Sequence, residues 1–341
     1  MSAPRNVALV LAGAVTKGAF EAGAIEVIAS RNIGVRRIVA ASSGALNGTA
    51  FAAAVRARRE IAAARELVEV WEREADLAGA IHPSLRALLG RRGISDQKKL
   101  LALLRRHVKP AHIADPAPID LRIMVAPLRG GAGRVDGEPA TTYSHIVPFE
   151  GSDFDDAERL DRVFVAATAS AALPVLFAPV DVPDLGLCTD GGLVNNTPLL
   201  AAFGEDRGAS LDAILVVAPT PALIEAPVDD YRGLELLAHQ IDMVYAEWLY
   251  QDLRRAVRQN EGLSRLDALA ARRGWTPPQV EEIKASLGLE QARYMPIVSI
   301  RPSTRLPGDI FSGFTDPAVR HTYVELGRAR AVEVLDHMGW R

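Results

Sequence analysis

The chain alternates between short, continuous apolar runs and longer segments with the spacing of amphipathic helices. The apolar runs are typical of strands that are buried on both faces of a parallel sheet, and they occupy residues 6–12, 37–41, 121–127, 213–218 and 296–300. Helical segments are expected at residues 19–30, 49–55, 155–172, 229–258, 264–273, 277–287 and 316–338. This alternation predicts an α/β fold: a single three-layer domain in which helices flank a mostly parallel central sheet.

We expect one domain over residues 5–341, with a core at about residues 5–220, a helical insertion at about 229–290 and a C-terminal strand and helix at 295–338. Residues 56–108 predict two or three further helices on one side of the sheet. Residues 130–133 predict a turn or hairpin, and extended segments are expected at residues 140–149 and 175–180. The insertion could form a lid or an interfacial surface, but packing against the sheet is the favoured expectation.

Composition narrows the class of protein without identifying it. The 341 residues are 49% hydrophobic with a formal net charge of −3, which gives no reason to expect nucleic-acid binding. The single cysteine, Cys188, excludes an intramolecular disulfide and a cysteine-cluster metal site. No apolar run is long enough to cross a membrane, and the run at Val7–Ala14 is interpreted as a buried strand rather than a secretory signal.

We therefore expect a cytoplasmic protein, with peripheral membrane contact as an option. A basic run around Arg91 and Arg92 could touch anionic lipid headgroups, although a solvated helix face is the favoured interpretation.

A serine lies where the second apolar run gives way to a helical segment. The sequence there is Ala40-Ala41-Ser42-Ser43-Gly44, close to the Gly-x-Ser-x-Gly pattern of a nucleophile elbow. Such a turn exposes the serine oxygen above the sheet edge, and the helix that follows directs its N–H groups toward negative charge. The first glycine of the pattern is missing, so a simple helix cap made by Ser42 or Ser43 stays open as the alternative.

The first apolar run ends in a tight loop, Gly13-Ala14-Val15-Thr16-Lys17-Gly18, which precedes the helix at residues 19–30. A loop of this kind offers backbone N–H groups to an anion at the start of the helix. The loop lacks the glycine patterns of nucleotide-binding proteins, which makes nucleotide binding the weaker interpretation. Donors for an oxyanion fit better, because ester hydrolases of this architecture take one N–H from such a loop and one from the residue after the nucleophile.

An acidic residue, Asp190, begins the downstream sequence Asp190-Gly191-Gly192, which is followed by Asn195-Asn196-Thr197-Pro198. Asp-Gly-Gly at the end of a strand is ordinarily a turn, and Pro198 is a favourable first residue for a helix. By itself this segment indicates no chemistry.

Taken together and in this order, the three segments resemble the patatin-like phospholipase family. That family has a glycine-rich oxyanion loop after its first strand, a Gly-x-Ser-x-Gly elbow about one βα unit later, and an Asp-Gly-Gly/Ala motif far downstream. The residues beside the motifs are also similar: Ala45-Leu46-Asn47, Ala169-Ser170-Ala171-Ala172-Leu173-Pro174 and Asn195-Asn196-Thr197-Pro198-Leu199. The resemblance covers about residues 5–220, with a looser similarity in the terminal helix.

The resemblance implies a lipid acyl-ester hydrolase of the phospholipase A or lysophospholipase type, with Ser42 as nucleophile and Asp190 as base. Ser Oγ is a poor nucleophile until a base takes its proton, and a desolvated carboxylate can be that base. The oxyanion would be held by main-chain N–H groups from the set Gly13, Ala14, Val15, Lys17, Gly18 and Ser43. The substrate would be a lipid or another acyl ester, and neither a cofactor nor a metal ion is implied.

Two positions depart from the family pattern. The usual oxyanion loop is Gly-Gly-Gly-x-Arg/Lys-Gly, whereas this chain has Ala14 and Val15 at the second and third positions, and Ala40 replaces the first glycine of the elbow. A β-branched valine fits poorly at positive φ. These departures make a catalytically weak or inactive lipid-binding or partner-binding protein one alternative.

Two other enzyme mechanisms are alternatives to the hydrolytic dyad. An acyltransferase could pass the same acyl-serine to an alcohol or thiol. A Ser-His-Asp hydrolase would need a histidine after Asp190, and His239, His321 and His337 all lie in predicted helices.

Overall fold

The computed structural model describes residues 6–31, 33–76, 95, 97–135, 137–203, 211–221, 234–289 and 292–340. The basic run around Arg91 and Arg92 lies outside the described residues.

The described strands form a mostly parallel eight-stranded sheet in the order β10-β9-β1-β2-β3-β8-β7, with β6 also paired to β3. The parallel strands are β10 (Ile297–Ile300), β9 (Ala213–Val217), β1 (Asn6–Leu11), β2 (Gly34–Ala41) and β3 (Asp120–Pro127). The antiparallel strands at one edge are β6 (His145–Glu150), β8 (Gly186–Asp190) and β7 (Val180–Val182). The α/β class and the central parallel sheet are therefore confirmed.

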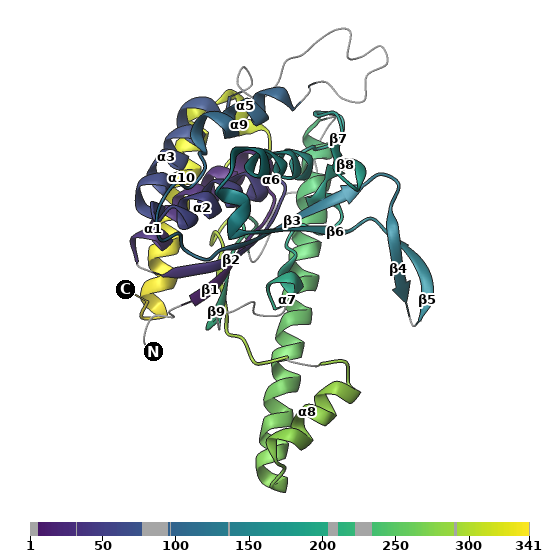
Figure 1. The fold of residues 1–341 in the computed structure, drawn as a ribbon. Helices are drawn as coiled ribbons and strands as arrows, with labels where there is room; N and C mark the ends of the chain where they lie inside the picture. Colours follow the sequence, from purple (N-terminus) through teal and green to yellow (C-terminus); the bar gives the residue numbers. More distant parts are fainter. Residues whose placement is uncertain are drawn as a thin grey trace.

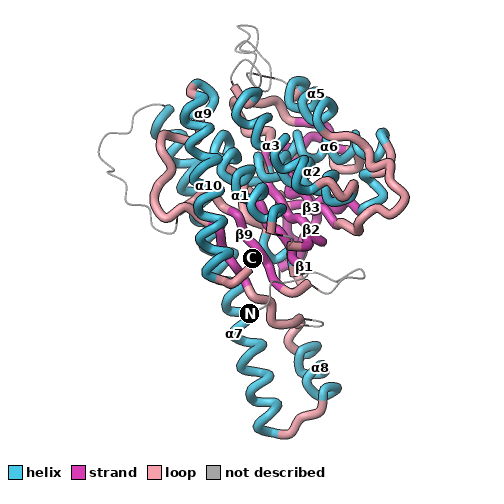
Figure 2. The backbone as a smooth tube through the Cα atoms, turned by 90° about the vertical axis from the view of Figure 1, so that its left-hand side faces the viewer, coloured by secondary structure: helices cyan, strands magenta, loops and turns pink. Residues whose placement is uncertain are grey.

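Helices cover both faces of the sheet, which makes three layers. The first face is packed against α1 (Gly18–Ser30), α2 (Ser43–Arg56), α3 (Glu60–Glu74), α5 (Lys98–His107), α6 (Ala157–Ser170) and α10 (Pro317–His337). The second face is covered by the 3₁₀ helix η4 (Leu199–Ala202) and by α7 (Leu234–Arg273). Figures 1 and 2 show α7 running past the sheet and continuing beyond it, to the end that carries α8 (Pro277–Ser286).

Alternation along β1 explains why both faces are buried. Successive side chains of a strand point to opposite faces, and here Leu9 and Leu11 join the core under α1 and α2 while Ala8 and Val10 join the core under α7. Both sets are apolar, so the strand appears in the sequence as one continuous apolar run.

Three predicted segments were wrong in detail. The segment at residues 140–149 is two strands: β5 (Glu138–Thr142) pairs with β4 (Gly131–Val135) in a separate hairpin, and β6 turns back to the main sheet. The extended segment at 175–180 is a three-residue strand at 180–182, and the helix expected from Pro198 is only the 3₁₀ turn η4. In each case the local sequence pattern was short, and it was too weak to fix the ends of the strand or helix.

The break predicted between residues 258 and 264 does not exist, because α7 is continuous over 40 residues from Leu234 to Arg273. Ser264, the first residue of the second predicted helix, lies inside α7. The Asn260 side chain binds the main chain of Met295 in both directions, with Asn260 Nδ2 2.6 Å from the carbonyl oxygen and Oδ1 3.0 Å from the N–H nitrogen. This tertiary contact stabilises the helix across Gly262, whose intrinsic cost in a helix is only about 1 kcal/mol.

The strand ends bring three distant segments together. Adjacent parallel strands β1 and β2 end at Leu11 and Ala41, so the loop after β1 and the turn at Ser42 emerge side by side. Ala41 pairs with Met124 of β3, and the next residue, Val125, pairs with Asp190 at the end of β8. None of the described helices combines the length and apolar character needed to span a membrane.

Candidate active site

Ser42 occupies a strained turn between β2 and α2. Its φ of 52° and ψ of −129° lie outside the regions that residues with a side chain prefer. The residue holds the N-cap position of α2, yet its side chain makes no capping hydrogen bond. Its N–H instead donates to Ser170 Oγ at 2.8 Å, and Ser170 Oγ donates to the carbonyl oxygen of Met124 at 2.6 Å. The turn therefore holds Ser42 through its main chain and leaves Oγ free for another partner.

Two glycines of α2 permit the close approach of strand and helix at this turn. A Cβ on Gly44 would lie 2.5 Å from the carbonyl oxygen of Leu11. A Cβ on Gly48 would lie 3.2 Å from the Cβ of Ala40, the residue that replaces the first glycine of the elbow pattern. Gly48 thus provides on the helix the space that Ala40 takes on the strand.

The partner of Ser42 Oγ is Asp190, to whose Oδ2 it donates a hydrogen bond of 2.7 Å. The other oxygen, Oδ1, accepts the N–H of Gly192 at 2.8 Å, and the Asp190 side chain is fully buried. Burial raises the pKa of Asp190 to about 7, even though hydrogen bonds from Ser42, Gly192 and Leu193 each lower it. The site therefore holds a serine hydroxyl against a carboxyl group that can exchange a proton near neutral pH.

The glycines after Asp190 are required by packing. A Cβ on Gly191 would lie 2.0 Å from the carbonyl oxygen of Met124, and one on Gly192 would lie 2.9 Å from Asp190 Oδ1. A side chain at Gly191 would therefore clash with the main chain of β3, and one at Gly192 would clash with the carboxylate itself.

The loop after β1 lies against the Ser42 side chain, and most of its main-chain N–H groups are bonded within the protein. Gly13 donates to Asn196, Ala14 to Ser43 Oγ, Thr16 to Ile310, Lys17 to the Ala14 carbonyl, and Gly18 to the carbonyls of Val15 and Thr16. Among the described residues of the candidate set, the N–H groups of Val15 and Ser43 are left without a protein acceptor. Both residues line the same pocket as Ser42.

Val15 adopts the positive φ that its β-branched side chain disfavours, with a value of 51°. The strain is sustained because the following residue is fixed to a distant segment. Thr16 donates to the carbonyl oxygen of Ile310 through both its N–H, at 3.2 Å, and its Oγ1, at 2.7 Å.

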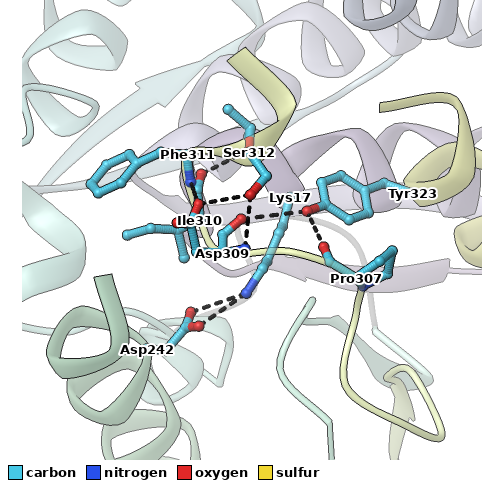
Figure 3. Close-up of polar contacts among 9 residues, drawn as sticks. Lys17, Asp242, Pro307, Asp309, Ile310, Phe311, Ser312 and Tyr323 are labelled. Carbon is cyan, nitrogen blue, oxygen red and sulfur yellow. Dashed lines mark hydrogen bonds and ion pairs between the residues drawn. The ribbon is translucent and has the colours of Figure 1, made fainter. Parts of the chain in front are cut away.

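The Lys17 side chain extends to α7. Its buried ammonium group forms an ion pair with Asp242 of α7, with Nζ 3.0 Å from Oδ2, as Figure 3 shows. The same view shows how the segment that binds Thr16 is itself held: Ser312 Oγ donates to Asp309 Oδ1 at 2.9 Å, and Tyr323 donates to the carbonyl oxygen of Pro307 at 2.6 Å. The loop is thus fixed from both sides of the sheet.

An apolar pocket of about 260 Å³ begins at Ser42. One face of α2 lines it from end to end, and α3, α5 and the segment after α6 close it with the side chains of Leu67, Trp71, Leu104, Leu173 and Phe177. Successive turns of α2 contribute residues from one side of the helix, and Ala57 follows directly after it: Ser43, Leu46, Asn47, Ala50, Ala53 and Ala54. The pocket therefore leads from the serine oxygen into apolar surroundings.

Histidine chemistry is not required by this geometry. A triad would place a histidine between the serine and the acid, but Ser42 Oγ donates directly to Asp190. His239 lies on α7, and His321 and His337 lie on α10, where His321 pairs with Glu72. Within the described ranges, no cluster of three or more His, Cys, Asp or Glu side chains is arranged to hold a metal ion.

Gly13 provides a test of how closely the loop and the serine fit together. A Cβ there would lie 2.4 Å from both Ser42 Cβ and Asn196 Oδ1. We expect Gly13→Ala to lower the free energy of unfolding by about 1–3 kcal/mol, as overpacking does in well-packed cores. Denaturant unfolding measures this.

The matched control is Gly262→Ala, at an exposed position of α7 where a Cβ meets nothing within 4 Å. It should leave stability unchanged or raise it by up to about 1 kcal/mol. Equal effects of the two variants would contradict the described fit.

Several residues that shape this site were not predicted from the sequence as site residues. Asn196 donates through Nδ2 to the carbonyl oxygen of Gly13 at 2.9 Å, and Ser170 fixes the Ser42 main chain. Both lie within segments whose sequence resembles the family, and this resemblance was the signal that could have pointed to them. Asp242 had none, because an acidic residue on a long helix is ordinary.

Comparisons with known proteins give the same family as the motifs. The sequence model of the patatin-like phospholipase family matches residues 9–203, which is more than half of the chain. Among curated proteins, no sequence matches this chain.

The solved structures that match this chain have low structural and sequence similarity to it. VipD from Legionella pneumophila has a TM-score of 0.38 and 13% identity, over 98% of this chain and 68% of its own. The heterodimeric ExoU–SpcU complex from the type III secretion system of Pseudomonas aeruginosa gives 0.29 and 16%, over 84% of this chain. The type III effector protein ExoU gives 0.32 and 13%, over 98%. The chain spans 60% and 54% of the matched chains in these last two structures. On the strength of the sequence match, this chain belongs to the patatin-like phospholipase family.

Proposed function

We propose that this protein hydrolyses acyl esters of lipids through an acyl-serine intermediate on Ser42, with Asp190 as general base. The observation that carries the proposal is the 2.7 Å hydrogen bond from Ser42 Oγ to a fully buried carboxyl group. A pKa of about 7 suits a group that must accept a proton from the serine and later return it.

In the first half-reaction, Ser42 Oγ attacks the ester carbonyl carbon while its proton passes to Asp190 Oδ2. The carbonyl oxygen gains negative charge, and the N–H groups of Val15 and Ser43 are the donors we assign to it. Collapse of this tetrahedral species expels the alcohol, which takes the proton from Asp190 and leaves the acyl group on Ser42.

In the second half-reaction, water attacks the acyl-serine and gives a proton to Asp190. The Oγ–carbon bond then breaks, Ser42 recovers that proton, and the free fatty acid leaves. The same carboxyl group therefore acts as base and acid in both halves, which a pKa close to neutral allows.

The apolar pocket is the site we assign to the acyl chain. From Ser43 to Ala54 the lining positions of α2 extend over about 17 Å, at about 1.5 Å per residue. The hydrocarbon core of a bilayer is about 30 Å thick, so the chains of one leaflet span about 15 Å. The pocket is thus long enough for the acyl chain of a membrane lipid. The cytoplasmic setting and peripheral membrane contact inferred from the sequence remain predictions.

The test is release of free fatty acid, measured by mass spectrometry, from a panel of diacyl phospholipid, lysophospholipid and neutral glyceride with the same acyl chain. We expect release from at least one class by wild type and none by Ser42→Ala. If the acyl group leaves the protein only as a new ester, and only when an alcohol acceptor is added, the protein is an acyltransferase. No turnover of any ester by folded wild type would contradict the proposal.

Ala50 provides a test of the acyl site, because it lines the pocket near the middle of the α2 face. We expect Ala50→Phe to lower kcat/KM for long-chain esters by about 10- to 100-fold, since apolar pockets discriminate by that range. Butyrate esters, which need only the first part of the pocket, should be hydrolysed at the wild-type rate.

The matched control is Ala62→Phe on the exposed side of α3, outside the pocket. It should leave kcat/KM unchanged for both long-chain esters and butyrate esters. Equal loss for short and long esters with Ala50→Phe would mean that the acyl chain lies elsewhere.

A further inference from the structure

Helix α7 presents one face to the loops that form the site. Asp242 pairs with Lys17 of the loop after β1, and two turns later Trp248 Nε1 donates to the carbonyl oxygen of Leu193, next to Gly192, at 3.3 Å. Tyr245 lies between them at a spacing of three residues, so its side chain shares this face.

The position of Tyr245 is confirmed by its surroundings. Together with Ala14, Lys17 and Asp242 it lines a cavity of about 20 Å³ between α7 and the loop after β1. The helix is held on both sides of Tyr245, which fixes the main chain of this residue relative to the loops of the site.

The Tyr245 side chain is only 1% exposed, and its buried hydroxyl makes no hydrogen bond of normal geometry to any described residue. Buried hydroxyl groups are rarely left without a hydrogen bond, because burial removes the water that would otherwise bind them. Tyr323 shows the usual arrangement in the same protein: it is equally buried, and its hydroxyl donates to the carbonyl oxygen of Pro307 (Figure 3).

The electrostatic surroundings of the phenol agree with this placement. Burial raises the pKa of Tyr245 well above its usual value, the Asp190 carboxylate raises it further, and the Ser42 hydroxyl, in a hydrogen-bonding contact outside normal geometry, lowers it. The phenol therefore stays neutral and keeps its proton. A neutral phenol is a hydrogen-bond donor.

On this geometry, and resting on the function proposed above, we propose that Tyr245 is a further catalytic residue that donates its O–H to Ser42 Oγ. The hydrogen bond forms when Oγ becomes negatively charged, during attack on the ester and again when Oγ leaves the acyl group. Catalytic hydrogen bonds are often misaligned in the free enzyme and tighten in the complex.

The proton balance of the reaction is unchanged by this role. The Ser42 proton passes to Asp190 and returns from it, while the Tyr245 proton stays on the phenol throughout. Tyr245 therefore stabilises charge on the nucleophile, and the donors on Val15 and Ser43 stabilise charge on the substrate oxygen.

The test is Tyr245→Phe, which keeps the ring and removes only the donor. We expect kcat for the best ester to fall about 10- to 100-fold with KM within twofold of wild type, because the bond exists only when charge has developed. The rate constant for labelling of Ser42 by a fluorophosphonate should fall by a similar factor. The melting temperature should not fall, because the hydroxyl makes no hydrogen bond of normal geometry in the free protein.

Tyr250→Phe, on the exposed side of the same helix, is the control and should leave kcat and labelling unchanged. If Tyr245→Phe is poorly folded, 3-fluorotyrosine at position 245, a stronger donor of nearly the same shape, replaces it and should keep kcat at or above the wild-type value.

Tyr245→Phe with kcat and labelling within twofold of an active wild type would overturn the role of Tyr245 and leave the proposed function standing. A folded wild type that neither hydrolyses esters nor forms the adduct would overturn the proposed function, and the role of Tyr245 with it. Loss of activity that only follows a lower melting temperature would show a structural role.

Discussion

Replacing Ser42 with alanine should reduce ester hydrolysis by at least about 10⁴-fold, because the reaction then has no nucleophile. The fold should persist. The contact that holds this turn is the hydrogen bond from the Ser42 N–H to Ser170 Oγ, and alanine keeps that N–H. Fatty acid release measures the activity, and thermal unfolding monitors the fold.

Ser30→Ala is the control, an exposed serine at the end of α1 whose hydroxyl bonds only to the carbonyl oxygen of Val27. It should behave like wild type in both assays. Retention of more than a tenth of the activity by Ser42→Ala would mean that another group attacks the ester.

Replacing Asp190 with asparagine should lower kcat by about 10²- to 10⁴-fold, because the amide cannot accept the serine proton. In wild type, kcat/KM should rise with pH through a midpoint near 7, since the carboxyl group must be ionised to act as base and its pKa is about 7. A wild-type profile that is flat between pH 5 and 9 would show that Asp190 is not the base.

Asp190→Asn lowers activity, but at alkaline pH it should raise the free energy of unfolding relative to wild type. The pKa of Asp190 is raised from 3.8 to about 7 on folding, so the folded state binds more protons than the unfolded chain between these values. Stability from this group is therefore fully present below about pH 4 and is lost as pH rises through about 7. The loss is on the order of 4 kcal/mol, at about 1.4 kcal/mol per pKa unit.

Urea unfolding of wild type and Asp190→Asn at pH 5 and pH 8 measures this. The pKa of Glu21, also fully buried, is raised well above its usual value by burial, and it adds its own pH dependence to both proteins. The difference between the two proteins isolates Asp190, and it should favour the asparagine variant more at pH 8 than at pH 5. An equal difference at both pH values would contradict the raised pKa.

The fold could be predicted from the sequence because its core strands are buried on both faces. Such strands appear as continuous apolar runs, and those at residues 6–12, 121–127, 213–218 and 296–300 match β1, β3, β9 and β10 to within two residues. The edge of the sheet was harder to predict. Strands β4 to β7 are short and partly exposed, so their pattern is weak and their pairing depends on neighbours far away in the sequence.

The site could be predicted only in part, for a similar reason. Ser42 and Asp190 could be proposed as a dyad because each lies in a local motif. The conformation of the loop after β1 depends on tertiary contacts. Side-chain contacts join Ala14 to Ser43, Thr16 to Ile310 and Lys17 to Asp242, at separations of 29 to 294 residues. No local pattern contains those contacts, which is also why Tyr245 of α7 carries no sequence signal.

The most direct measurement of the central claim is the intact mass of the protein after treatment with a fluorophosphonate at several pH values. The proposed mechanism predicts one adduct, located on Ser42 by peptide mapping, with a labelling rate that rises through a midpoint near pH 7. The rate should be greatly reduced in Asp190→Asn, and the adduct should be absent in Ser42→Ala. No adduct on folded wild type, or one that persists in Ser42→Ala, would contradict the mechanism.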